Sequence, residues 1–411
     1  MKSFLPFSIL LILMVSCVSC NRESSKLNPN SNYARLSVNA SDFWLVHGSL
    51  VSRYSEAEGN GRFEDFEISP LLNEMQTVDD QLVVGYEIIF GDLRQVRKYV
   101  LYAGIPKPDK HAINCDEIGS IVSNLTDPSL LALDSQRICF MKSNTDFESS
   151  KIVLEVIHGR LLLSEDKKTV QFEQINSYSQ NAYYHGLPPR MLSSTLKDCV
   201  LITNQVGMND FEITALLIEP LGEMKAHRIA SYQKLIDDPS FVGANLSKDG
   251  SILVSCEFRY DSGERPTLSE IAIGVSRLKD WEVQEQHSYT WKFANWGGGG
   301  NLFSDYPIRM IGDEFAIIAT PDGWVEIDLK RQMDDEKPDL ILRAYNQAPK
   351  RLHKEAPPDF RGILHFENPR KLLLVQRFVD SKDAILELKE SDLKKRVLKC
   401  DSSVVPKVKR R

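Results

Sequence analysis

Cysteine is scarce in this chain, with 7 residues in 411. Two of them, Cys17 and Cys20, lie near the N-terminus, and the other five lack the spacing of metal ligands: Cys115, Cys139, Cys199, Cys256 and Cys400. Cys139 and Cys199 occupy apolar, strand-like runs, where a small buried thiol is more common than a disulfide, although an exported location would permit one. The cysteines therefore predict no metal site.

Long apolar runs are also missing. The longest, from Phe4 to Val15, has 12 residues, whereas a transmembrane helix needs about 20. The net charge of −7 and the pI near 5.7 argue against a nucleic-acid partner. Basic residues concentrate only from Arg370 onward. That end is predicted to be a solvated strand and a frayed tail, or alternatively a segment attracted to anionic lipid headgroups.

The sequence lacks the signatures of several enzyme classes. It has no His-Glu-x-x-His, no Gly-x-Ser-x-Gly and no glycine loop ending in Lys-Ser/Thr. The run WGGGGN (296–301) has the glycines of a phosphate loop but no lysine, and is predicted to be a mobile loop. The acidic run MDDEKPD (333–339) lacks the alternating ligand spacing of a calcium loop and predicts a solvated hairpin tip. We therefore predict no cofactor.

The N-terminus has the order of a secretory signal peptide, with Lys2, then the apolar run, then small residues. A serine precedes both Cys17 and Cys20, which resembles a bacterial lipobox, where the cysteine is acylated and becomes the first mature residue. Met14 lies three residues before Cys17 and favours Cys17, with Cys20 as the alternative. The predicted organisation is a signal peptide (1–20) cleaved before one of these cysteines, a flexible polar tether (21–40), one folded domain (41–400) and a basic tail (401–411).

Short β-like runs fill the predicted domain. The strongest run of each unit begins near the following residues: Gln81, Gln136, Cys199, Ser251, Glu314 and Lys371. The regular spacing of these starting residues along the chain, with about four strands in each unit, is typical of propeller blades. We predict an all-β fold, a β-propeller of about six to seven four-stranded blades with few short helices, and membrane contact only through the N-terminal lipid.

Local patterns refine this prediction. GWVEIDL alternates, with Val325, Ile327 and Leu329 on one side. His158-Gly159 and Asp322-Gly323 predict tight hairpin turns. Apolar residues three or four apart predict one short helix over 116–125.

One unit carries a family resemblance. LSKDGSILVS (246–255) followed by SEIAIGV (269–275) resembles the repeat of TolB-like, or WD40-like, β-propellers, in which Ser-Pro-Asp-Gly makes a turn before a buried strand. Lys248 stands where that repeat usually has proline. The resemblance implies the propeller architecture and no functional residue.

Candidate ligand-binding residues come from three segments that interrupt the blade pattern, NAYYHGLPPR (181–190), YTWKFANWGGGGN (289–301) and RLHKEAPPDFRG (351–362). Connections between blades lie where the central channel opens, and loops there often carry function. Aromatic faces suit stacking on sugars or peptides, and arginine suits a carboxylate. The predicted site contains Tyr184, His185, Arg190, Trp296, Asn301, Asp305 and Arg361.

Three functions are compatible with these features. The first is an exported, lipid-anchored propeller that binds an envelope protein, carbohydrate or peptide without catalysis. The second is a polysaccharide hydrolase or lyase with His185 or Asp305 as acid or base. The third is an envelope assembly scaffold. If the protein were secreted by a eukaryote, no lipid would be expected on the N-terminal cysteine. Glycosylation would then be expected at Asn39, Asn124 or Asn245.

Overall fold

The computed structural model describes most of the chain between residues 42 and 404. The described segments are 42–47, 50–55, 62–70, 72, 74–78, 82–90, 97–123, 129–134, 136–146, 151–165, 169–182, 189–206, 211–219, 222–237, 239, 241–261, 267–292, 308–311, 314–320, 323–334, 340–345, 359–367, 370–378, 381–388, 393–398 and 402–404. Beyond residue 341 the description covers the backbone.

Almost every described residue lies in or between strands. Sheet A contains β1 (Asp42–His47), β2 (Leu50–Ser55), β3 (Arg62–Ser69), β4 (Glu74–Val78), β5 (Leu82–Phe90), β6 (Arg97–Lys107) and β7 (Ala112–Ser123). Sheet B contains β8 (Ser129–Ala132), β9 (Arg137–Asp146), β10 (Lys151–Leu163) and β11 (Val170–Ala182). Sheet C contains β12 (Arg190–Ser193), β13 (Cys199–Gln205), β14 (Phe211–Ile218) and β15 (Met224–Arg228).

The second half of the chain continues the same pattern. Sheet D contains β16 (Phe241–Leu246), β17 (Ile252–Asp261), β18 (Thr267–Lys279), β19 (Glu282–Lys292) and β28 (Ser402–Val404). Sheet E contains β20 (Ile308–Ile311), β21 (Phe315–Thr320), β22 (Gly323–Asp328), β23 (Leu340–Tyr345) and β27 (Leu393–Leu398). Sheet F contains β24 (Asp359–Glu367), β25 (Arg370–Phe378) and β26 (Ser381–Leu388). Helix in the described segments is limited to η4 (Pro108–Lys110) and α2 (Leu329–Asp334).

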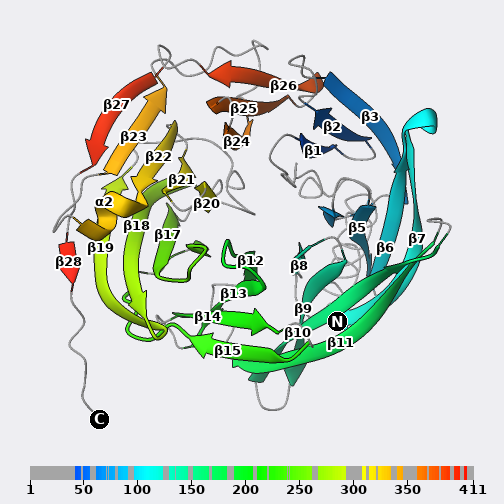
Figure 1. The fold of residues 1–411 in the computed structure, drawn as a ribbon, viewed down its shortest axis with the longest axis horizontal. Helices are drawn as coiled ribbons and strands as arrows, with labels where there is room; N and C mark the ends of the chain where they lie inside the picture. Colours follow the sequence, from blue (N-terminus) through cyan, green and yellow to red (C-terminus); the bar gives the residue numbers. More distant parts are fainter. Residues whose placement is uncertain are drawn as a thin grey trace, which may run out of the picture.

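The sheets follow one another around a ring (Figure 1). Within each group, consecutive strands pair antiparallel from the inner strand to the outer one. The chain therefore folds as a β-propeller, and the predicted fold class is confirmed. The two strand groups of sheet A, β1–β3 and β4–β7, are joined by a parallel pairing of β3 with β7, so the number of six to seven blades stays a prediction.

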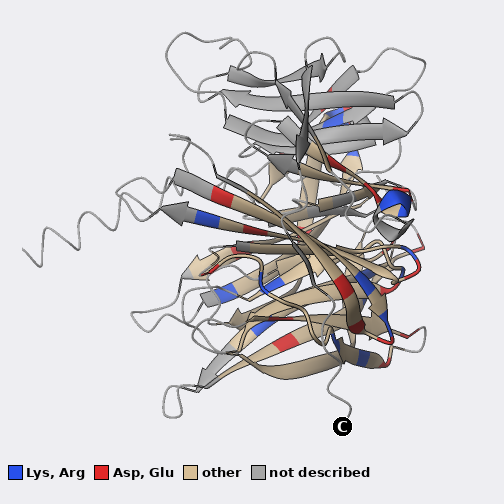
Figure 2. Ribbon diagram, turned by 90° about the vertical axis from the view of Figure 1, so that its left-hand side faces the viewer, with Lys and Arg blue, Asp and Glu red and all other residues tan. Residues whose placement is uncertain are grey.

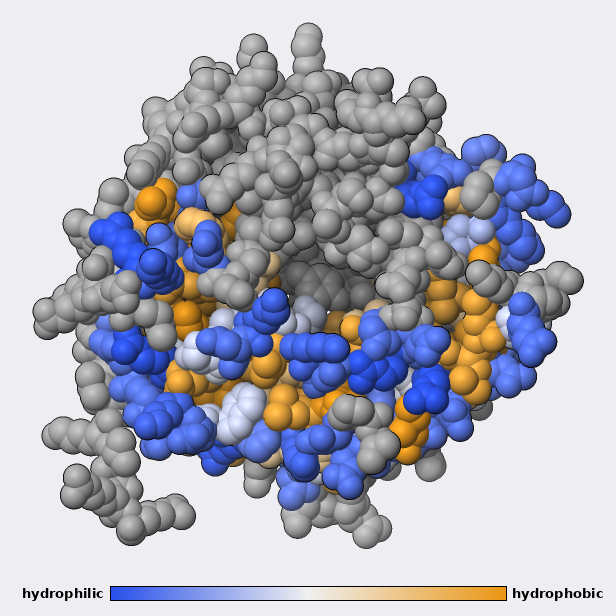
Figure 3. Space-filling model, viewed as in Figure 1, coloured by the Kyte–Doolittle hydropathy of each residue, from blue (hydrophilic) through white to orange (hydrophobic). Residues whose placement is uncertain are grey.

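Hydrophobic residues of neighbouring sheets form the core. One cluster joins sheets A and B, the next joins B and C, the next C and D, and another D and E. Val325, Ile327 and Leu329 are buried as their alternation predicts. Figure 3 shows hydrophobic residues of the described sheets lying between hydrophilic ones, and in the side view of Figure 2 acidic and basic residues are interspersed along the strands.

The six strongest runs of the sequence each begin at the second strand of a group, namely at β5, β9, β13, β17, β21 and β25. Burial explains this regularity where side chains are described, because the second strand packs into the core on both of its faces, as β9 and β13 do. In β13, for example, every residue is buried. The predicted spacing therefore measures the repeat of the ring.

The predicted helix at 116–125 is wrong, because 112–123 forms β7. β7 has an extra residue opposite the step between Leu101 and Tyr102. This bulge changes the alternation of the strand, so that Ile118 and Ile121, three residues apart, both pack against the core between sheets A and B. The helix-like spacing of these apolar residues is therefore produced by a bulge in a strand.

The predicted turn at His158-Gly159 is also wrong. Both residues lie inside β10, at a bulge in its pairing with β11. Gly159 is required there because a Cβ atom would lie 2.1 Å from the ring of Phe172. By contrast, Thr320 pairs with Gly323, so a hairpin does connect β21 and β22 at the second predicted turn.

The C-terminal strands return along the outside of the ring (Figure 1). β27 pairs antiparallel with β23, and β28 pairs antiparallel with β19. β28 lies within the stretch that the sequence predicts as a basic tail. The returning segment, here called the C-terminal strap (residues 393–404), covers the outer edges of two sheets.

The buried cysteines are free thiols where the structure describes them: Cys115, Cys139, Cys199 and Cys256. Burial raises the pKa of Cys199 to about 12, so this thiol stays protonated and unreactive. Among the described helices, none is long and apolar enough to cross a membrane.

Candidate functional site

Most of the predicted site lies outside the described residues: Tyr184, His185, Trp296, Asn301 and Asp305. The same holds for the candidate lipidation residues Cys17 and Cys20. Arg190 is the first residue of β12 and pairs with Thr203 of β13, and Arg361 lies in β24 with only its backbone described. The predicted channel-mouth site therefore stays a prediction.

The described residues form a different pocket, with a volume of about 530 Å³. It is lined by four connections of sheets C and D, namely β12–β13, β14–β15, β16–β17 and β18–β19, together with the strand residues that flank them. In a group of four antiparallel strands, the first-to-second and third-to-fourth connections lie at the same end of the strands. The connection from the fourth strand to the next sheet lies at the opposite end. The pocket therefore lies at the other end of the strands from the predicted mouth.

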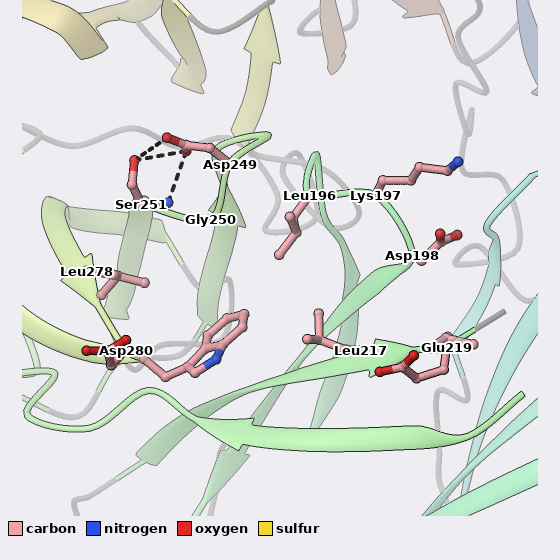
Figure 4. Close-up of a pocket in the computed structure, with 12 residues that line it drawn as sticks. Leu196, Lys197, Asp198, Leu217, Glu219, Asp249, Gly250, Ser251, Leu278 and Asp280 are labelled. Atoms are coloured by element: carbon pink, nitrogen blue, oxygen red, sulfur yellow. Dashed lines mark hydrogen bonds between the residues drawn. The ribbon is translucent and has the colours of Figure 1, made fainter.

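The floor of the pocket is apolar. Leu196 and Leu217 of sheet C point toward one another, and Leu278 of sheet D lines the opposite side of the pocket (Figure 4). Trp281 also lines the pocket and packs partly buried against the core between sheets C and D. The floor is thus an extension of that core to the surface.

The β16–β17 connection is a tight turn held by its own side chains. Asp249 accepts hydrogen bonds from the hydroxyl of Ser247 (2.6 Å) and from the amide of Ser251 (3.0 Å), the latter drawn in Figure 4. Gly250 has a φ of +73°, which glycine adopts without a Cβ clash. Partial burial opposes the charge of Asp249, but the serine hydrogen bonds outweigh it and lower its pKa. Asp249 is therefore a carboxylate at neutral pH.

The β18–β19 connection has only two residues, Asp280 and Trp281, and both have positive φ values, 52° and 64°. Such a turn is normally made by Asn-Gly or Asp-Gly. A tryptophan in the left-handed region is unusual and costs about 1–2 kcal/mol relative to glycine. The indole stacks on the ring of His227, with centroids 4.7 Å apart and planes at 15°. A large aromatic side chain is thus held at a glycine position, at the edge of a pocket.

Hydrogen bonds fix this turn to its surroundings. The amide of Ala230 donates to the carbonyl of Trp281 (2.9 Å), and the amide of Val283 donates to the carbonyl of Ala230 (3.0 Å). The amide of Leu278 donates to the carbonyl of Ser251 (2.7 Å), which joins the two turns of sheet D. Trp281 is therefore positioned by the backbone of three segments.

The carboxylates on the sheet C side are paired with cations. Asp198 forms an ion pair with Arg137 of β9, which also pairs with Asp134. Glu219 accepts a hydrogen bond from Lys225 (2.8 Å). These pairs place a cation beside each of the two carboxylates and, through Arg137, connect sheet B to sheet C.

The pocket combines apolar and aromatic surface with carboxylates and one lysine, Lys197. This composition suits the binding of a polar ligand that also presents apolar groups. The described residues contain no group of three or more His, Cys, Asp or Glu side chains that could hold a metal ion.

Sequence reasoning missed this pocket. The sequence predicts that Ser-Lys-Asp-Gly is a folding motif, and the structure confirms it as a turn between β16 and β17. One sequence feature could have indicated the pocket. Asp280-Trp281 lies between two strand-like runs, where a two-residue hairpin turn is expected to contain glycine or asparagine in place of tryptophan. Which connections of sheets C and D come together was not readable from the sequence.

A second polar cluster lies in sheet D around Glu257 of β17, which is fully buried. Its oxygens accept hydrogen bonds from the hydroxyl of Tyr232 (3.0 Å) and from the amides of Leu235 (3.0 Å) and Ile236 (2.9 Å). Burial raises the pKa of Glu257 to about 7, although these hydrogen bonds act in the opposite direction. Glu257 thus holds the β15–β16 connection against sheet D.

No protein-family model and no curated protein matches the chain. Solved structures similar to it include Hsv2 from Kluyveromyces lactis, 13% identical over 77% of this chain and 94% of that chain, with a TM-score of 0.33. An α-L-arabinofuranosidase from Fusarium graminearum is 10% identical over 77% and 92%, with a TM-score of 0.36. The β-propeller domain of the Trilobed protease from Pyrococcus furiosus is 11% identical over 79% and 96%, with a TM-score of 0.30. At these TM-scores the comparisons transfer no ligand and no residue.

Proposed function

We propose that this chain is an exported, lipid-anchored β-propeller that binds a carbohydrate, peptide or protein ligand without converting it. The observation that supports binding is Trp281, held in a strained turn at the edge of the pocket. Strained backbone is more common at functional sites than elsewhere. An indole presents a flat apolar face and a polar edge, which suits sugars and peptide side chains.

The state of the pocket carboxylates supports a non-catalytic role. Acid–base catalysis needs two titratable groups near a common point, at least one with a pKa close to the working pH. Asp198 and Glu219 are paired with cations, and the pKa of Asp249 is lowered by its serine neighbours. We assign these carboxylates to ligand recognition.

Binding is tested with two substitutions of Trp281 and a defined set of compounds. Trp281→Gly removes the indole and relieves the positive φ, so its thermal midpoint is expected within about 3 °C of wild type. Trp281→Ala keeps the strain and should be less stable than the glycine variant by about 1 kcal/mol. Maltotriose, N-acetylglucosamine and capped lysine and alanine peptides are then screened by thermal shift.

At least one compound is expected to stabilise wild type, to leave Trp281→Gly unshifted and to be recovered chemically intact. If no compound stabilises wild type, or if the recovered compound has been cleaved, the proposal of a non-catalytic binder fails.

The anchor is tested separately. In a bacterial host, wild type is expected in the membrane fraction with an acylated first residue, because stable attachment takes more than one acyl chain. Cys17→Ser should move the protein to the soluble fraction, and mass spectrometry of the N-terminus checks the modification. Loss of attachment only with Cys20→Ser would move the anchor to Cys20. An unmodified, soluble wild type would contradict the lipid anchor.

A further inference from the structure

His158 of β10 is buried between sheets B and C. It is 1% exposed, and its cross-strand neighbour Cys139 of β9 belongs to the core cluster that joins these two sheets. Val156, two residues earlier in β10, belongs to the same cluster, so alternation along the strand directs the imidazole toward sheet C. The ring therefore lies in a largely apolar contact between two sheets.

Neither ring nitrogen of His158 has a hydrogen-bond partner among the described residues. A neutral imidazole carries one N–H donor and one acceptor, and a buried polar group without partners is uncommon. Burying a charge without an acceptor is far more costly than burying a neutral polar group. His158 therefore fits this position only in its neutral form.

The charged groups around His158 do not favour its protonation. Arg137 is its diagonal neighbour on the same face of β9. Burial, and then the positive charge of Arg137, lowers the pKa of His158. Asp134 and Asp198 act in the opposite direction, but both carboxylates are ion-paired with Arg137. The neighbouring elements also carry the titratable side chains of Arg160, Glu173, Tyr178, Glu219, Glu223 and Lys225.

Arg137 connects this buried position to the pocket. It pairs with Asp198 of the β12–β13 connection, and Leu196, Lys197 and Asp198 of that connection line the pocket on the sheet C side (Figure 4). The wall of the pocket is thus held to sheet B by an ion pair whose arginine lies next to a buried, unpartnered histidine.

We infer that His158 is an acid-sensitive switch, whose protonation separates sheet B from the β12–β13 connection and loosens the sheet C wall of the pocket. This inference goes beyond the proposed binding function and does not depend on the ligand. An exposed ring takes up a proton near its ordinary pKa of 6.5, whereas the buried ring excludes it. The closed contact is therefore fully stable above about pH 6.5 and is destabilised below it, by up to about tenfold in the equilibrium constant per pH unit.

Hydrogen exchange of the backbone amides tests this inference. Residues 194–200 are followed in wild type and in His158→Phe, which keeps an aromatic ring that cannot be protonated, near pH 7.5 and near pH 5.5. At one pH the intrinsic exchange rates and the other histidines are the same in both proteins, so the ratio of their rates reports opening of the contact. From the higher to the lower pH this ratio is expected to rise about tenfold for residues 194–200 and to stay constant for β17.

Two further variants and one substitute complete the test. His111→Asn removes an exposed histidine at a positive φ that asparagine tolerates, and it should behave as wild type. Arg137→Gln breaks the ion pair and should speed exchange of residues 194–200 already near pH 7.5. His158→Gln, which also cannot be protonated, replaces His158→Phe if that variant does not fold.

A ratio that does not change with pH would overturn the inference. An equal rise in β17 would also overturn it, because acid would then loosen the whole ring. Unchanged exchange in Arg137→Gln would remove the link to the pocket and overturn the switch. The thermal-shift screen at neutral pH decides the binding function independently.

Discussion

Replacing Glu257 by alanine is expected to lower the free energy of unfolding by about 4 kcal/mol. The substitution leaves the buried amide of Ile236 and the partly buried amide of Leu235 without an acceptor, and each lost partner costs about 1–3 kcal/mol. The removed side chain also leaves a cavity in a fully buried position. Urea unfolding measures the change. Glu173→Ala on the exposed face of β11 is the control and should stay within about 0.5 kcal/mol.

Glu257 is also expected to make the stability of the protein depend on pH. Its pKa of about 7 in the folded chain lies above the ordinary value of 4.5, so between these values the folded state holds a proton that the unfolded state has released. The contribution of Glu257 to stability is therefore complete below about pH 4.5 and is lost as the pH rises to about 7, by on the order of 3 kcal/mol.

Comparison with Glu257→Gln isolates this group from the other titrations. The stability of wild type relative to this variant should be largest near pH 5 and should decrease toward pH 8. A difference that is constant over this range would show that Glu257 does not change protonation there.

The second large effect is expected from deletion of residues 389–411, which removes the C-terminal strap. β27 pairs with β23 over six residues and β28 with β19 over three, so the deletion uncovers the outer edges of sheets D and E. Exposed edges pair with other chains. We expect a loss of about 3 kcal/mol of stability and concentration-dependent association, seen by urea unfolding and by light scattering.

Deletion of residues 405–411 alone is the matched control. It removes the basic end and keeps both strap strands, so neither the stability nor the association state should change. If the longer deletion also keeps the stability and the association state of wild type, the strap does not protect these edges.

The sequence by itself determined where the strands of the ring lie. The second strand of a group packs into the core on both of its faces, so its apolar run is nearly continuous, as in β13. Turn chemistry is equally local, and the Ser-Lys-Asp-Gly turn before β17 forms from hydrogen bonds within five residues. For these reasons the all-β class and the repeat were predictable.

Only the tertiary structure decided the rest, because it depends on residues far apart in the chain. The bulge in β7 is produced by pairing with β6 and gives Ile118 and Ile121 a helical spacing. The strap pairs strands that are far apart in the chain, as the contacts Leu340 to Leu398 and Gln286 to Val404 show. The pocket joins Asp198 of sheet C with Trp281 of sheet D, and no local pattern specifies that meeting, since it follows from how two sheets pack against each other.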